Sequence, residues 1–272
     1  MIYQNNGFTY KRDGYCVGKI ITQKVIQSLG CIADVHAGHK NFNESILDNV
    51  INWILKNDAL WFGGGDLIEC STKTSVGAGW AEQVMSPQEQ IKYMTEKLKP
   101  ISHLCIGLVQ GNHEDRAFKQ AGVNITEIIA YNLGVEFFGD ELFAIIARDK
   151  EVTDRGKAYT LYACHTQTTN KNPGLAMNFM SREMDWMNCD IVCKAHGHDL
   201  GLSPPAMYVD IDCRNLAISE KYRWYWLVGH YLNRPNSYIS KTSKPPKPLG
   251  TEVLYLNMDP SKPKLVSGEL IK

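Results

Sequence analysis

The amino-acid sequence predicts a mixed fold of helices and strands, either α/β or α+β. Short apolar runs, which indicate strands, alternate along the chain with longer segments whose apolar residues recur at helical spacing. Two helix starts are marked. Asn43 precedes one periodic segment and can cap it, and Ser86 stands before Pro87, which suits the first position of a helix.

The predicted elements follow one another along the whole chain. The apolar runs that predict strands are 29–33, 59–62, 104–109, 143–147, 160–164, 190–194, 206–211, 222–228 and 252–256. Helical periodicity covers 44–56, 87–98, 125–133 and, for a shorter helix, 175–187. We expect a single domain over residues 1–272, with the chemistry-bearing motifs in 29–200 and the strands of 201–272 completing the sheets.

Composition excludes several classes of protein. The 272 residues suffice for one large domain or at most two, and 29 basic against 29 acidic residues give no global attraction to nucleic acid. No segment approaches the roughly 20 apolar residues that span a bilayer, and the first residues, MIYQNNGFTYKRDGY, lack the apolar stretch of a secretory signal. We therefore expect a soluble, cytoplasmic protein.

The eight cysteines indicate neither disulfides nor a zinc module. Most of them lie in apolar runs, as Cys31, Cys105, Cys164 and Cys193 do, and no C-x-x-C pair occurs. They are expected to be buried, reduced thiols that behave as small hydrophobic side chains.

Five segments with metal-binding side chains each follow a predicted strand. They are ADVHAG at 33–38, GGGD at 63–66, GNHED at 111–115, His165, and AHGH at 195–198. Each one alone is weak evidence, because Asp, Gly, Asn and His are common in turns. Together they contain five of the eight histidines, always in the same context of a strand followed by a turn. This conjunction predicts a metal site built at strand ends.

The order and residue types of these segments resemble the calcineurin-like metallophosphoesterase superfamily. Its pattern is D-x-H, G-D, G-N-H-(E/D), H and G-H-x-H, and the chain supplies DVH, GGD, GNHED, H and AHGH over about residues 29–200. Ala195 replaces the usual Gly, and Glu69 stands where some members carry a second Asp. The Asp-Arg-Gly of Ser/Thr protein phosphatases is absent, which disfavours that branch. The segment GNHEDRAFKQAGVN and the Pro-rich stretch near the C-terminus also resemble members encoded by phages or mobile elements.

The resemblance implies a fold and a ligand set. The fold would be two packed mixed β-sheets flanked by helices, a four-layer sandwich. Two divalent ions would be bound, Mn²⁺ as first choice, with Fe, Zn²⁺ or Ni²⁺ as alternatives that suit carboxylate, imidazole and amide ligands. The resemblance implies three ligands for the first ion, three for the second and one bridging carboxylate: Asp34, His36 and His198; Asn112, His165 and His196; and Asp66.

The resemblance also implies a mechanism. A hydroxide shared by the two ions would attack phosphorus in line with the leaving oxygen. His113 would protonate the leaving group as general acid, or stabilise charge on the phosphate. We expect Asp115 or Glu114 to orient His113, and Arg116 to contact the phosphate of the substrate.

Several functions stay open at this level. The missing Asp-Arg-Gly favours a phosphodiesterase acting on a nucleic acid, a nucleotide or another small diester, ahead of a phosphomonoesterase. A DNA nuclease would share the scaffold, but the chain shows no basic stripe. A non-catalytic metal-binding protein should lack a ligand or His113, and neither is missing. Trp80, in the loop 70–86, is expected to shape a substrate groove. His39, His103 and His230 lie outside the motifs and are interpreted as structural or surface residues.

Overall fold

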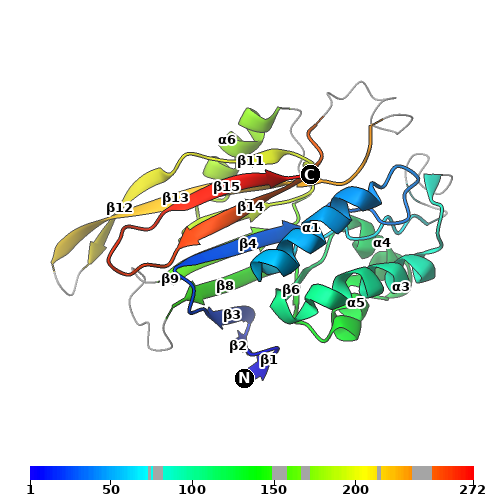
Figure 1. Ribbon diagram of the computed structural model, residues 1–272, viewed down its shortest axis with the longest axis horizontal. Coiled ribbons are helices and arrows are strands. Elements are labelled where there is room, and N and C mark those ends of the chain that lie inside the picture. The colour runs from blue at the N-terminus through cyan, green and yellow to red at the C-terminus, as the bar shows by residue number, and fades with distance from the viewer. Residues whose placement is uncertain (73–74, 76–81, 149–157, 167–171, 213–215, 235–246) are drawn as a thin grey trace.

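The computed structural model describes residues 1–72, 75, 82–148, 158–166, 172–212, 216–234 and 247–272. Its strands form one long, curled, mixed sheet that divides into two halves sharing strand β13 (Figure 1). The strands of the first half are, in spatial order, β1 (Ile2–Asn5), β2 (Phe8–Asp13), β3 (Tyr15–Ile21), β8 (Glu141–Ala147), β9 (Ala158–Cys164), β10 (Ile191–Lys194) and β13 (Ala217–His230). The second half continues from β13 through β14 (Gly250–Asn257), β4 (Ile26–Ile32), β5 (Leu60–Gly63), β6 (Cys105–Val109) and β7 (Phe137–Gly139).

Strand β13 joins the halves because it is long enough to pair with both. Its residues 224–227 pair in parallel with β10, and Gly229 and His230 pair with β14. Strand β13 also pairs, in antiparallel fashion, with β11 (Leu200–Leu202) and β12 (Ala206–Asp212). Strand β15 (Val266–Ile271) pairs with β14. The C-terminal part of the chain thus supplies the link between the two halves.

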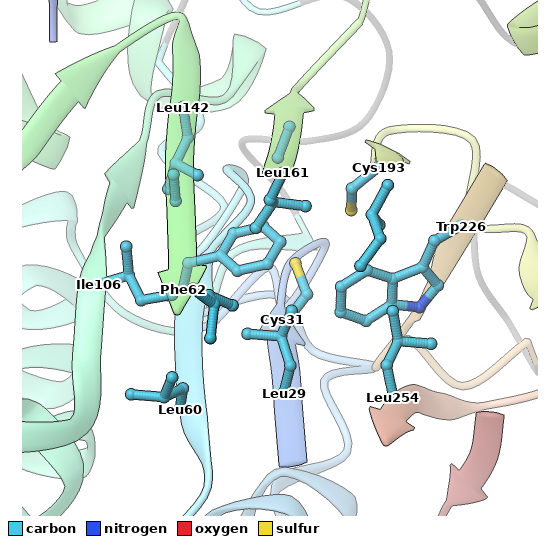
Figure 2. Close-up of a cluster of buried hydrophobic side chains, with 14 of the residues drawn as sticks. Leu29, Cys31, Leu60, Phe62, Ile106, Leu142, Leu161, Cys193, Trp226 and Leu254 are labelled. Atoms are coloured by element: carbon cyan, nitrogen blue, oxygen red, sulfur yellow. The ribbon is translucent and has the colours of Figure 1, made fainter. Parts of the chain in front are cut away.

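The two halves pack face to face over a hydrophobic core (Figure 2). Phe62 of β5 meets Trp226 of β13 edge to face, with ring centroids 5.8 Å apart. Side chains alternate along each strand, so the neighbour Trp61 points the other way, into a second core with the helices. The run 222–228, predicted as a strand, lies within β13, and its residues Trp224, Tyr225 and Trp226 are all buried.

Helices cover the outer faces, which completes four layers. Helices α1 (Glu44–Asn57), α3 (Pro87–Leu98) and α5 (Ile125–Leu133) pack on the second half, and α6 (Pro173–Glu183) packs on the first. Two further helices among the described residues are η1 (Lys99–Leu104), which is of the 3₁₀ type, and α4 (Asn112–Ala121). The α/β fold with two packed mixed sheets flanked by helices is confirmed. Within the described part of the chain, no helix has the length and apolar character needed to cross a membrane.

The capping residues in the sequence correctly predicted where helices α1 and α3 begin. The Asn43 side chain accepts the Ile46 N–H at the start of α1, and Ser86 forms a reciprocal capping box with Glu89 at the start of α3. Strands β1 to β3, β7, β11 and β15 and helix α4 had no sequence prediction. Helix α4 buries only Glu114, so it has no apolar stripe to detect.

Candidate metal centre

The five motif segments meet at one edge of the molecule. Strands β4, β5 and β6 are parallel to one another, and β9 is parallel to β10, so their carboxyl ends are grouped. The side chains follow these ends directly: Asp34 and His36 after β4, Asp66 after β5, Asn112 and His113 after β6, His165 after β9, and His196 and His198 after β10. Loops at the carboxyl ends of parallel strands are the usual place for a site in α/β sheets.

The backbone is strained at most of the expected ligands. Five of the nine non-glycine residues with positive φ in the described part of the chain are Asp34 (52°), His36 (51°), Asp66 (51°), His196 (73°) and His198 (56°). Each such residue costs on the order of 1–3 kcal/mol and persists only where the surroundings demand it. Because the strain coincides with the polar side chains predicted to bind metal, it is independent evidence that their direction matters.

Two motif glycines allow the loops to approach closely. Gly65 has φ +89°, and a Cβ there would lie 2.7 Å from Cα of Gly111 and 2.7 Å from Nδ1 of His165. A Cβ on Gly111 would lie 2.0 Å from the backbone N of Asp66. Any larger side chain at either position would push the ligand loops apart.

The first group of converging ligand atoms comes from Asp34, His36 and His198. Nε2 of His36 lies 3.3 Å from Nε2 of His198, which in turn is 3.5 Å from Oδ1 of Asp34. That Oδ1 is buried and has no hydrogen-bond partner, while Oδ2 accepts the His196 backbone N–H at 2.9 Å. A buried carboxylate oxygen without a partner, facing two imidazole nitrogens, fits a divalent cation.

The second group comes from Asp66, His165 and His196. Nε2 of His165 lies 3.2 Å from Oδ2 of Asp66 and 3.1 Å from Oδ1 of Asn112. The ring of His165 is fixed from behind, because Nδ1–H donates to the Gly64 carbonyl at 2.8 Å. This bond leaves Nε2 directed toward the two oxygens, the orientation that a metal ligand requires once Nε2 has lost its proton.

Asp66 lies between the two groups. Its Oδ2 is 3.2 Å from Nε2 of His165 in the second group and 3.9 Å from Nε2 of His36 in the first. Its other oxygen, Oδ1, accepts the backbone N–H of His113 at 2.8 Å. One carboxylate oxygen therefore faces both sets of nitrogens, which is the position expected of a bridging ligand. Each group also draws side chains from both halves of the sheet.

Burial and neighbouring charges set the ionisation of these side chains. Burial lowers the pKa of His36, of His198 and, to about 4, of His196, so these imidazoles are neutral at pH 7. Burial likewise raises the pKa of Asp34 to about 8. Burial acts against the charge on His165, yet the nearby Asp66 carboxylate outweighs it and raises the pKa of His165 to about 10. Without metal, Asp34 and His165 therefore hold protons at pH 7.

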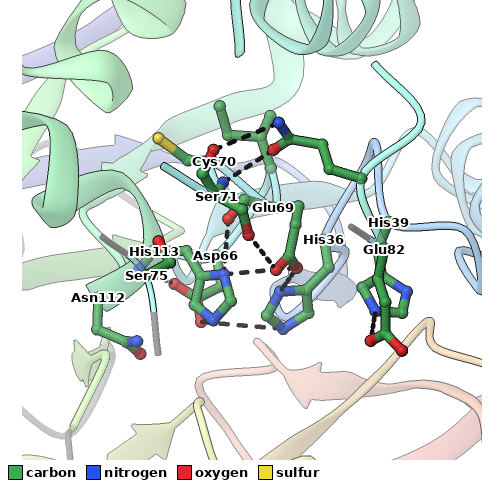
Figure 3. A network of polar contacts seen from close by, with 12 residues as sticks. His36, His39, Asp66, Glu69, Cys70, Ser71, Ser75, Glu82, Asn112 and His113 are labelled. Carbon is green, nitrogen blue, oxygen red and sulfur yellow. Dashed lines mark hydrogen bonds and ion pairs between the residues drawn. The ribbon is translucent and has the colours of Figure 1, made fainter. Parts of the chain in front are cut away.

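His113 lies beside this cluster and is oriented by Glu69 (Figure 3). Nδ1–H of His113 donates to the Glu69 carbonyl at 2.8 Å, and the Glu69 carboxylate Oε2 lies 3.5 Å from the same nitrogen. The same Oε2 is 3.1 Å from Nδ1 of His36. Nε2 of His113 faces the site, 3.8 Å from Oδ2 of Asp66. Burial opposes ionisation of Glu69, but its hydrogen bond with His36 and the charge of His113 lower the pKa of Glu69 to about 2.

The two carboxylates expected to orient His113 are placed elsewhere. The Asp115 carboxylate accepts from Gln110 at 3.1 Å and pairs with Lys119. Residues two apart on a helix point in different directions, which explains why the contact to His113 comes from Glu69 instead. The buried Glu114 carboxylate accepts the backbone N–H groups of Asp66 and Ile68, each at 3.1 Å, and so holds the Asp66 loop.

Arg116 is near the site, as the sequence predicts. It is half-buried, and NH1 lies 3.3 Å from Nδ1 of His113. The expected role of Trp80 falls on a residue outside the described part of the chain.

Three further residues support the ligand loops and were not predicted. His230, interpreted from sequence as structural or surface, is buried and stacks on His198 with centroids 4.8 Å apart. Lys247 pairs with the buried Asp199 at 2.7 Å and donates to the Gly197 carbonyl, between the two ligands His196 and His198. Only spatial proximity reveals these contacts, although Asp199 directly follows the last motif.

Comparisons with known proteins give fold-level likenesses only. No family model matches the sequence, and no curated protein matches it. Among solved structures, a conserved uncharacterized protein of Streptococcus pneumoniae, titled a predicted phosphoesterase, is 12% identical with a TM-score of 0.31. A double mutant of Vps29 from Entamoeba histolytica is 10% identical with a TM-score of 0.36. Each comparison covers 91% of this chain and 99% of the other. At these values neither likeness carries an inference about activity, which must come from the site.

Proposed function

We propose that the protein is a two-metal phosphoesterase that hydrolyses a phosphate ester, with diesters favoured. The observation that carries the proposal is the position of Asp66 Oδ2 between two groups of converging imidazole and carboxylate atoms. The donor set contains no cysteine thiolate, and it suits Mn²⁺ first, with Fe, Zn²⁺ or Ni²⁺ as alternatives.

The proposed ligand assignment follows the two groups. Asp34, His36 and His198 would hold one ion, and Asn112, His165 and His196 the other, with Asp66 shared. When bound, the pair would polarise the phosphate oxygens and make hydroxide available from water near neutral pH. Glu69 accepts from Nδ1 of His36, which leaves the Nε2 lone pair of His36 available to bind the first ion.

His113 would serve as the general acid. Its Nδ1–H is committed to the Glu69 carbonyl, so the second proton of the imidazolium is carried on Nε2, which faces the site. The Glu69 carboxylate, 3.5 Å from Nδ1, lies on the same side of the ring. Proton transfer from Nε2 to the leaving oxygen would then complete cleavage. Arg116 is positioned to neutralise charge on the phosphate, and Asp115 is assigned no direct part.

The first prediction concerns substrate class. With Mn²⁺ added, the protein should hydrolyse bis-(p-nitrophenyl) phosphate faster than p-nitrophenyl phosphate, and a chelator should abolish both activities. The same assay with cyclic nucleotides and with single- and double-stranded DNA tests the nucleotide and nuclease alternatives. Faster monoester hydrolysis would overturn the diester preference. Inactivity with every substrate under Mn²⁺, Fe²⁺, Zn²⁺ and Ni²⁺ would remove the enzyme proposal and leave a non-catalytic metal-binding protein.

A second prediction concerns pH. The raised pKa values of Asp34 and His165 mean that both groups must lose a proton before they bind metal, whereas His36, His196 and His198 are already neutral. Below about pH 8, the affinity for each Mn²⁺ should therefore rise by up to about 10-fold per pH unit, or about 100-fold for the loading of both ions, with two protons released per fully loaded chain. Above that pH only the His165 proton remains to be released, so the slope should fall.

Calorimetry in buffers with different ionisation enthalpies measures this proton release directly. Asp34→Asn removes one titrating group and should lower the number of protons released by about one. Metal affinity that does not change between pH 6 and pH 8 would contradict the ionisation states assigned to the site.

A further inference from the structure

A hairpin that follows the last predicted metal-binding motif extends beyond the body of the sheet (Figure 1). It consists of β12 and the first half of β13, which pair over residues 206–212 and 217–223. The pairing of β13 with β10 begins only at Trp224, so the outer part of the hairpin has no further strand against it among the described residues.

One face of this hairpin is apolar and faces solvent. Opposed residues of an antiparallel pair share a face, and the pairs here are Met207 with Tyr222, Val209 with Glu220, and Ile211 with Ile218. The exposed fractions are 60% for Met207, 57% for Val209, 69% for Ile211 and 74% for Ile218. A contiguous apolar row of this kind is uncommon on a monomer and marks a contact surface.

The opposite, polar face is the one that is anchored to the protein. The Tyr208 hydroxyl donates to Oδ1 of Asn188 at 2.9 Å, and the buried Arg223 lies over the Tyr208 ring and pairs with Asp185 at 2.6 Å. The usual arrangement, with the apolar face inward and the polar face outward, is therefore reversed. Tyr222, at the base of the apolar face, packs against the core, whereas Met207, Val209, Ile211 and Ile218 further out are exposed.

The distribution of charged side chains on the apolar face indicates that the outer edge of β12 is the part that makes a contact. In the described structure β12 pairs only with β13, so its outer edge offers unpaired backbone N–H and C=O groups. Met207, Val209 and Ile211 lie on this edge strand, whereas Glu220, the charged residue of the face, lies on β13, away from the edge. Free edges are normally guarded by charges, and on this face the edge strand carries none.

We propose that β12 pairs with β12 of a second copy of this chain, antiparallel and about a twofold axis at Val209. This register places Met207 opposite Ile211 of the second copy and Val209 opposite itself, so every pair on the apolar face is aliphatic. On the other face it places Tyr208 opposite Asp210. Moving the twofold axis by one residue, to Asp210, would place the two Asp210 carboxylates opposite each other, and their repulsion excludes this register.

The test is the mass of the full chain in solution, measured by light scattering after size exclusion and by sedimentation over a range of concentrations. The wild-type protein should reach twice the mass of one chain. Val209→Lys places two ammonium groups opposite each other and should weaken the dimer at least about tenfold. Tyr131→Lys, at an 84% exposed position on α5, is the matched control and should leave the mass unchanged.

A cross-linking variant keeps the test decisive if Val209→Lys fails to fold. In a Cys213→Ser background, Val209→Cys should form an intermolecular disulfide on mild oxidation, because directly opposed residues bring their Cβ atoms within reach. Val84→Cys, at a 66% exposed position, should not. A chain that stays monomeric at every concentration, or a dimer that Val209→Lys leaves intact and Val209→Cys does not cross-link, overturns the proposal.

Discussion

Asp66→Asn is expected to abolish binding of the proposed metal pair and to lower turnover by more than about 100-fold. Substitutions beside a metal ligand already cause losses of about 10- to 100-fold. Asn keeps the size of Asp66, and its Oδ1 can still accept the His113 backbone N–H. What it removes is the charge of the one oxygen that faces both groups of ligands. The variant should therefore fold as the wild type does but fail to bind the two ions.

Metal content by mass spectrometry, Mn²⁺ titration by calorimetry and diester turnover measure this effect. Asp140→Asn, at an exposed turn between β7 and β8, is the matched control and should behave as wild type. Thermal unfolding of both metal-free variants checks that the chain is folded. An Asp66→Asn protein that binds two ions with unchanged affinity would contradict the bridging role.

His113→Ala is expected to lower turnover by about 100- to 10,000-fold while leaving metal affinity nearly unchanged. The reason is geometric: Nε2 of His113 faces the site, and the ring converges with His36 and Glu69 rather than with the atoms of either proposed ligand group as a whole. His103→Ala, at an exposed position in η1, is the control and should have wild-type activity.

The leaving group separates the two roles open to His113. If His113 donates a proton, the variant should lose more activity on an ester with a poor, alkyl leaving group than on a p-nitrophenyl ester, whose leaving group departs without protonation. Equal losses on both would assign His113 to stabilising charge on the phosphate. Full activity of His113→Ala would remove it from the mechanism.

Much of the candidate centre could be predicted from sequence because the neighbouring residues in the chain identify its side chains. Asp34, His36 and Asp66 follow apolar runs at once, and glycines beside them permit tight turns. Parallel strands then bring such turns together without further information. Short apolar runs likewise predicted the strands that the motifs follow.

Other parts of the structure depend on contacts that no local pattern records. Glu69 reaches His113 only because the Asp66 loop folds back over the start of α4, and His230 reaches His198 only through the pairing of distant strands. Strand β2 contains Lys11, Arg12 and Asp13, so it offers no apolar run. It becomes a strand by pairing with its neighbours β1 and β3. Tertiary context decides such segments.

The division of each ligand group between the two halves of the sheet has a mechanical consequence. His36 and His198 are separated by 162 positions in the chain, yet their Nε2 atoms lie 3.3 Å apart. An ion bound to both would act as a removable cross-link that closes a loop of that length. Chain-entropy arguments assign such a closure about 5 kcal/mol, which is comparable to the whole stability of many domains. The metal pair would then stabilise the packing of the two halves of the sheet as well as take part in hydrolysis.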